Sequence, residues 1–160
     1  MKGWSVSESP SRAGLHLIVT VQSLACALPI ARVIETMRPL PVQHIDGAPE
    51  VVLGAAIIRG LPTPVVDASR LLGAAGSAAP GRFVILGVDG RRVALAVTSV
   101  QGVRVLGPES FTALPPLLAQ ADGQAVAAIG ALDQELVVLL GGVRMVPDSV
   151  FAALPEGAPA

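Results

Sequence analysis

The sequence predicts an all-β protein in which two pseudo-repeated, five-stranded β-barrels pack together. Short runs rich in β-branched residues, such as residues 15–21, alternate along the chain with turn signals. The dipeptide Asp89-Gly90 lies between two such runs and favours the positive φ angles of a tight hairpin. The same order of segments occurs twice, which indicates duplication of one β module.

Each half of the chain is expected to supply five strands. They are predicted at residues 15–21, 25–30, 32–38, 52–59 and 62–67, and again at residues 82–88, 92–98, 100–106, 125–132 and 135–141. Helical structure is expected as one turn at 68–72, around 116–121, and as a C-terminal helix at 147–154. Asp67 is expected to cap the turn at 68–72 through its side-chain oxygen.

The repeat is visible in pairs of matching segments. Ala27-Leu28 matches Ala94-Leu95 and Val33 matches Val100 at one constant spacing, and residues 64–67 match 138–141 at a slightly longer one. One module of this size exposes its sheet edges, so two copies gain stability by packing together. The predicted organisation is a flexible tail at 1–12, one domain of two intertwined barrel subdomains at 13–146 with a linker at about 73–81, and a C-terminal helix and tail at 147–160.

Composition excludes several functional classes. With 11 basic and 12 acidic residues, the chain has no basic field for nucleic acid or an anionic membrane surface. Cys26 is the single cysteine, which excludes an internal disulfide and a cysteine-based metal cluster and fits a reducing compartment. His16 and His44 have neither metal-ligand spacing nor a nucleophile motif nearby, so no catalytic residue, metal or cofactor is expected. The uncharged run at 13–31 contains polar residues and a proline, and is interpreted as buried strands.

Three stretches resemble the CheW-like domain family, and the likeness extends from about Leu15 to Met145. Residues 27–37 are similar to the family's opening "ALPI..V.E.I", and residues 54–73 resemble "G..NLRG...PV.DL...LG" in both order and spacing. Residues 90–103 resemble the pattern "G.R.G..VD.V..V" of the second barrel. The chain departs from these patterns at Ile57, Ala68, Thr98 and Gly141.

The resemblance implies two SH3-like barrels and a non-catalytic, cytoplasmic adaptor. One surface would bind the regulatory domain of a CheA-type histidine kinase, and another would bind the cytoplasmic tip of a chemoreceptor, without nucleic acid and without membrane insertion. The residues expected to bind partners by this resemblance are Arg59, Gly60, Val33, Glu35, Gly54, Val100 and Val103.

Each of these residues also has a structural interpretation. Arg59 presents a planar fork of five donors beside the slim Gly60, but it could instead stabilise its own barrel by bonding Asp67 or Glu35. Val33 and Glu35 share one face of an extended strand, although Val33 could equally be a core residue, and core packing is the preferred interpretation for any single valine. Gly54 would allow close approach in a groove, or permit a strand bend.

Two other functions remain open. The departures at Ile57 and Gly141 are compatible with an adaptor of a non-motility chemosensory pathway, one that controls pili or second messengers. Alternatively, Lys2 and Arg12 before an apolar stretch, with Leu24-Ala25-Cys26 as a lipoprotein cleavage site, would suit an exported or lipidated ligand-binding barrel.

Overall fold

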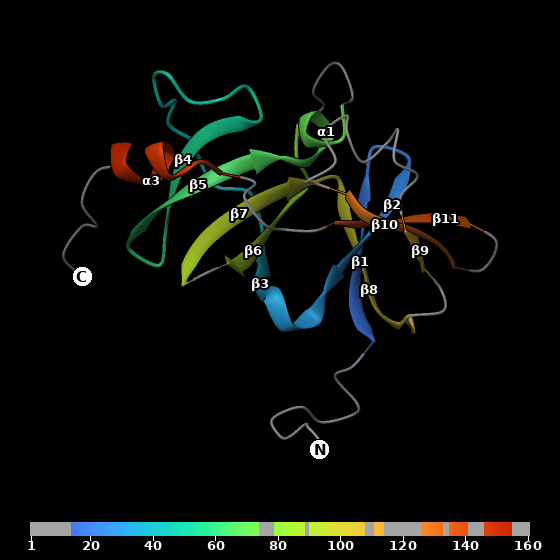
Figure 1. Ribbon diagram of the computed structural model, residues 1–160. Coiled ribbons are helices and arrows are strands. Elements are labelled where there is room, and N and C mark those ends of the chain that lie inside the picture. Colours follow the sequence, from blue (N-terminus) through green and yellow to red (C-terminus); the bar gives the residue numbers. More distant parts are fainter. Residues whose placement is uncertain are drawn as a thin grey trace.

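The computed structural model describes residues 14–73, 79–88, 90–107, 111–113, 126–132, 135–140 and 146–154, which form two β-sheets and three short helical segments (Figure 1). The first-half elements are β1 (Leu15–Val21), β2 (Leu24–Pro29), η1 (Ile30–Arg32), β3 (Val33–Met37), β4 (Val52–Ile58), β5 (Leu61–Asp67) and α1 (Ala68–Leu71). The second-half elements are β6 (Arg82–Val88), β7 (Arg91–Val97), β8 (Ser99–Val105), β9 (Phe111–Ala113), β10 (Val126–Leu132), β11 (Glu135–Leu140) and α3 (Asp148–Ala153).

All ten predicted strands are confirmed, with ends that differ by at most one residue. The strand β9 was missed because its three residues are too few to show alternation. The helical turn at 68–72 and the C-terminal helix are confirmed as α1 and α3. The predicted tail at 1–12, residues 74–78 of the predicted linker and the helix around 116–121 lie outside the described residues.

Each sheet combines strands from both sequence repeats. The first sheet has the order β8-β1-β2-β11-β10-β9, and the second has the order β3-β6-β7-β5-β4. The hairpin β1–β2 therefore lies between strands of the second repeat, and the hairpin β6–β7 lies between strands of the first. We call the first sheet the first barrel and the second sheet the second barrel.

The strand registers show that the two barrels are built alike. In the second barrel the parallel ladder pairs Val65 with Ala94, and in the first barrel the corresponding ladder pairs Leu139 with Ala27. The ladder between β3 and β6 shifts register at Ile34, and the ladder between β8 and β1 shifts at Gln101, the matching position of the repeat. Duplication has preserved the bulges.

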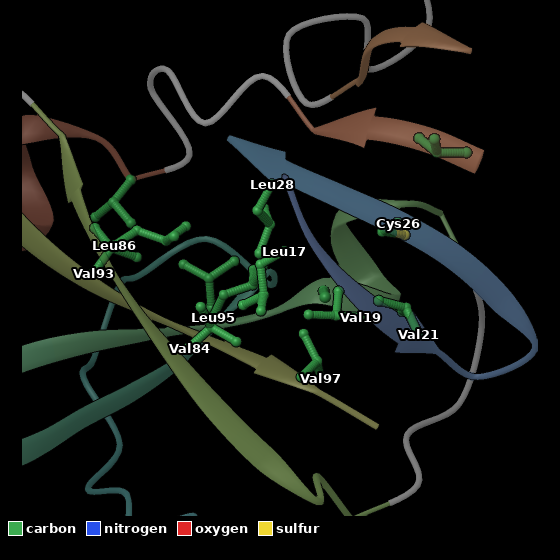
Figure 2. Close-up of a cluster of buried hydrophobic side chains, with 14 of the residues drawn as sticks. Leu17, Val19, Val21, Cys26, Leu28, Val84, Leu86, Val93, Leu95 and Val97 are labelled. Carbon is green, nitrogen blue, oxygen red and sulfur yellow. The ribbon is translucent and has the colours of Figure 1, made fainter. Parts of the chain in front are cut away.

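The largest hydrophobic cluster lies between the two sheets, where β1, β2, β6 and β7 face one another (Figure 2). Leu17 and Val19 of β1 point into it, whereas Ile18 points the other way into a smaller cluster inside the first barrel. Phe83 and Ile85 of β6 line the matching cluster inside the second barrel. Because these central strands are buried on both faces, they appear in the sequence as nearly continuous apolar runs.

Candidate partner-binding surface

The tip of the β4–β5 hairpin is a two-residue turn made of Arg59 and Gly60. Ile58 pairs with Leu61 across it, and the φ angles of the turn residues are 53° and 77°. Positive φ at both central residues is the mark of a type I′ turn, whose twist matches that of the flanking strands. For Arg59 this left-handed conformation is uncommon, since its Cβ crowds the backbone. The turn holds the Arg59 side chain at the end of the second barrel.

Arg59 forms a two-point ion pair with Glu35 of β3. The Nε atom donates to Oε2 at 3.1 Å, and Nη2 donates to Oε1 at 2.8 Å. The side chain of Arg59 is 67% exposed and that of Glu35 is 24% exposed. The hydrogen bond from Arg59, and secondarily its charge, lowers the pKa of Glu35, and the same bond raises the pKa of Arg59.

This ion pair joins two strands that lie at opposite ends of the second sheet's strand order. It is the structural role that the sequence left open for Arg59, with Glu35 as the partner and not Asp67. Asp67 accepts a hydrogen bond from the Ser69 amide at 2.9 Å and lies 3.5 Å from the guanidinium of Arg70. The predicted capping role of Asp67 is therefore confirmed.

Val33 and Val100 occupy matching positions in the two barrels and have the same surroundings. Both are half-buried and pack against the cluster between the sheets. Val103, by contrast, is 50% exposed, and Val105 on the same face of β8 is 72% exposed. The two outer valines of this edge strand are available for contact with another protein, whereas Val33 and Val100 mainly support the core.

The close approach that Gly54 permits is to a loop of the same chain. Gln43 and Ala55 exchange two backbone hydrogen bonds of 2.8 Å, which lays residue 43 across β4. A Cβ atom on Gly54 would lie 2.1 Å from the carbonyl oxygen of Gln43. Glycine is required here by internal packing, at a φ of 149°.

Two exposed aliphatic side chains beside Arg59 were not predicted as site residues. Ile57 is 54% exposed and Leu61 is 48% exposed, on either side of the turn. The alternation of side chains between the two faces of β4 could have identified Ile57, because the buried Ile58 requires its neighbour Ile57 to face outward. We define the tip surface as Ile57, Arg59 and Leu61 with Glu35, and the edge surface as Val103 and Val105.

The remaining chemically active side chains occupy structural positions. The Nδ1 atom of His16 lies 2.8 Å from the carbonyl oxygen of Gly14, and exposed His44 lies 3.5 Å from Asp46. Burial raises the pKa of the Cys26 thiol to about 12, so it stays protonated at neutral pH. Among the residues that the structure describes, no three His, Cys, Asp or Glu side chains form a group that could hold a metal ion, and no helix is long and apolar enough to span a membrane.

Comparison with known proteins places this geometry in context. The family model described as CheW-like domain matches residues 15–149. The chain is similar to the solved structure of the scaffolding protein TtCheW from Thermoanaerobacter tengcongensis, with 20% sequence identity and a TM-score of 0.73 over 84% of this chain and 99% of that chain. A search of curated proteins gave no match. The structural likeness confirms the predicted all-β class with two SH3-like barrels.

Proposed function

Since this chain belongs to the CheW-like domain family, we propose that it is a non-catalytic, cytoplasmic adaptor that couples chemoreceptors to a CheA-type histidine kinase. The observation that carries the proposal is the tip surface. At the end of the second barrel it presents a guanidinium–carboxylate pair, and the exposed side chains of Ile57 and Leu61 flank the turn on β4 and β5. Arginine set among apolar side chains is typical of the few residues that dominate the energy of protein interfaces.

An adaptor needs two separate surfaces, and the described residues offer them. The tip surface lies at one end of the second barrel, and the edge surface lies on β8 at the outer edge of the first. In this proposal the regulatory domain of the kinase binds the tip surface, and the receptor tip contacts the edge surface. Interfaces of this kind bury roughly 1,600 Å² in total, so each would extend beyond the residues named here.

The departure at Ile57 bears on which kinase is bound. Its side chain is exposed beside Arg59, so the change from the family's asparagine alters the surface and leaves the core unchanged. This observation favours a partner that differs from the usual one, as in a pathway controlling pili or second messengers. An adaptor of such a pathway is therefore the second candidate function.

The lipoprotein alternative conflicts with the position of Cys26. Cleavage before this residue would remove β1, which pairs with both β2 and β8 in the first barrel. It would also remove Leu17 and Val19 from the cluster between the sheets. A chain that starts at Cys26 could not keep this fold.

The test is binding of the full-length protein to the regulatory domain of a CheA-type kinase from the same cell, measured by calorimetry. We expect micromolar binding, weakened about tenfold or more by Arg59→Ala and by Leu61→Asp. The substitution Val103→Asp should leave kinase binding intact and weaken binding to the receptor tip. Val103→Asp is more informative than the same change at Val100 would be, because Val100 packs against the core.

Val42→Asp is the matched control, since Val42 is 36% exposed on a loop outside both surfaces. It should bind both partners as the wild type does. All variants are compared by circular dichroism and thermal unfolding, so that loss of fold is not counted as loss of binding. Absence of binding to every such kinase would contradict the proposal.

A further inference from the structure

The C-terminal helix α3 follows the first barrel in sequence but contacts the second. Figure 1 shows α3 beside β4 and β5, away from β10 and β11 of the first barrel. The Nη1 atom of Arg91, the first residue of β7, donates to Oδ1 of Asp148 at 2.6 Å, and the Arg91 guanidinium lies 4.5 Å from the centroid of the Phe151 ring. The helix therefore crosses from one barrel to lie on the other.

Few interactions hold this helix in place. It has six residues, too few to be stable by itself in water. Val150 is its single buried side chain, at 2% exposure, and reaches the cluster between the two sheets, whereas Phe151 and Leu154 are half-buried. The Arg91–Asp148 pair joins side chains that are 46% and 89% exposed, and ion pairs this exposed contribute little.

The seat of the helix is the surface that α3 covers at the two hairpin ends of the second barrel, at residues 61–63 and 90–92. An open groove of about 360 Å³ runs along this seat and is lined by these residues together with Phe151 and Leu154. Solvent therefore reaches the border between α3 and the hairpin ends, where the contact is not closely packed.

Leu61 belongs to both this seat and the tip surface. Whatever covers the seat therefore reduces access to the tip surface from that side. We propose that α3 is a releasable strap, which competes with the kinase regulatory domain for the end of the second barrel. This inference rests on the proposed function for the identity of the competitor.

The first measurement concerns the strap alone and needs no partner. Hydrogen exchange of the α3 amides in the full-length protein should be much faster than that of the β7 amides, because opening the strap leaves the barrel folded. Asp148→Arg should speed α3 exchange about two- to fivefold by replacing the ion pair with repulsion. The double variant Arg91→Glu with Asp148→Arg should restore it, and Ser149→Arg, which places an arginine one residue away and keeps the Arg91–Asp148 pair, should change it little. Exchange of α3 as slow as that of β7 would overturn the proposal.

The second measurement is kinase binding by the same variants. If the strap blocks the site, the apparent affinity equals the intrinsic affinity multiplied by the fraction of molecules in which the strap is open. Asp148→Arg should therefore tighten binding by about the factor by which it speeds exchange, and the double variant should return it to the wild-type value. Unchanged or weaker binding by Asp148→Arg, despite faster exchange, would overturn the competition. If neither the wild type nor any variant binds, the proposed function fails and the competition fails with it, while the exchange data still decide whether α3 is released.

Discussion

Gly54 and Gly102 both adopt backbone conformations that other residues rarely adopt, with φ angles of 149° and 140°, but their surroundings differ. A Cβ on Gly54 would meet the carbonyl of Gln43 at 2.1 Å, whereas a Cβ on Gly102 would have no atom within 4 Å. Gly102→Ala should therefore cost only the backbone strain, about 1–3 kcal/mol in the free energy of unfolding. Gly54→Ala should cost more than that, because the loop at residue 43 must also move.

Urea unfolding of the two variants beside the wild type measures this difference. Equal costs would mean that the bridge between Gln43 and Ala55 does not hold the loop against β4 in solution.

Glu35 provides a pH-dependent test of the ion pair with Arg59. Its pKa is lowered in the folded protein, so the pair adds stability above the ordinary glutamate pKa, and this contribution is lost as the pH falls through the lowered folded-state value. In Arg59→Ala the pKa of Glu35 should rise towards its ordinary value. Carboxyl NMR titration of both proteins checks this. An unchanged Glu35 pKa in the variant would show that the pair does not persist in solution.

At the scale of single elements, local sequence accounts for most of the strands and turns. The hairpin predicted at Asp89-Gly90 is confirmed by the pairing of Val88 with Arg91. The turn at Arg59-Gly60 has the same two-residue length, but arginine is not a typical turn residue and gave no such signal. Its conformation becomes understandable only when Glu35 is seen within hydrogen-bonding distance, because a tertiary contact offsets the strain at Arg59.

The strand β2 makes Cys26 chemically inert in the folded state. The thiol is fully buried, and burial raises its pKa to about 12. A disulfide reagent such as DTNB should therefore label Cys26 at least about a hundredfold more slowly at pH 8 than an exposed thiol, since the thiolate is the reactive form. The control is Ser99→Cys in a Cys26→Ala background, which places a single thiol on the exposed start of β8. Similar labelling rates would contradict the position of Cys26 in the core.

At the scale of the whole molecule, one short connection explains why each sheet contains strands from both repeats. In the first sheet β8 is antiparallel to β1, which is antiparallel to β2, so β8 and β2 run in the same direction. If all strands of the first repeat formed one sheet, β3 would pair with β1 in the position of β8 and would run parallel to β2. The chain would then have to return along the whole length of β2, about 20 Å, before β3 could begin. The three residues of η1 span only about 10 Å even when extended. They carry the chain into the other sheet instead.

This connectivity predicts that neither half of the chain folds alone. A fragment of residues 1–78 would leave β1, β3 and β5 without their neighbours β8, β6 and β7. We expect fragments 1–78 and 79–160 to be unfolded separately and to form a structured 1:1 complex when mixed. Circular dichroism and analytical ultracentrifugation of each fragment and of the mixture provide the measurement. Cooperative thermal unfolding of a single fragment would contradict the strand order.

The amino-acid order alone was enough to predict ten of the strands, the duplication and the family. Alternation of apolar residues depends on neighbours along the chain, so strands such as Leu15–Val21 are readable without any tertiary contact. Only the folded molecule shows which strands share a sheet, which of the expected site residues are exposed, and what each of them contacts. Val33 and Val103 look alike in sequence, yet one packs against the core and the other faces solvent, because burial depends on strands distant along the chain. For the same reason the pairing of Arg59 with Glu35 and the position of α3 on the second barrel required the folded molecule.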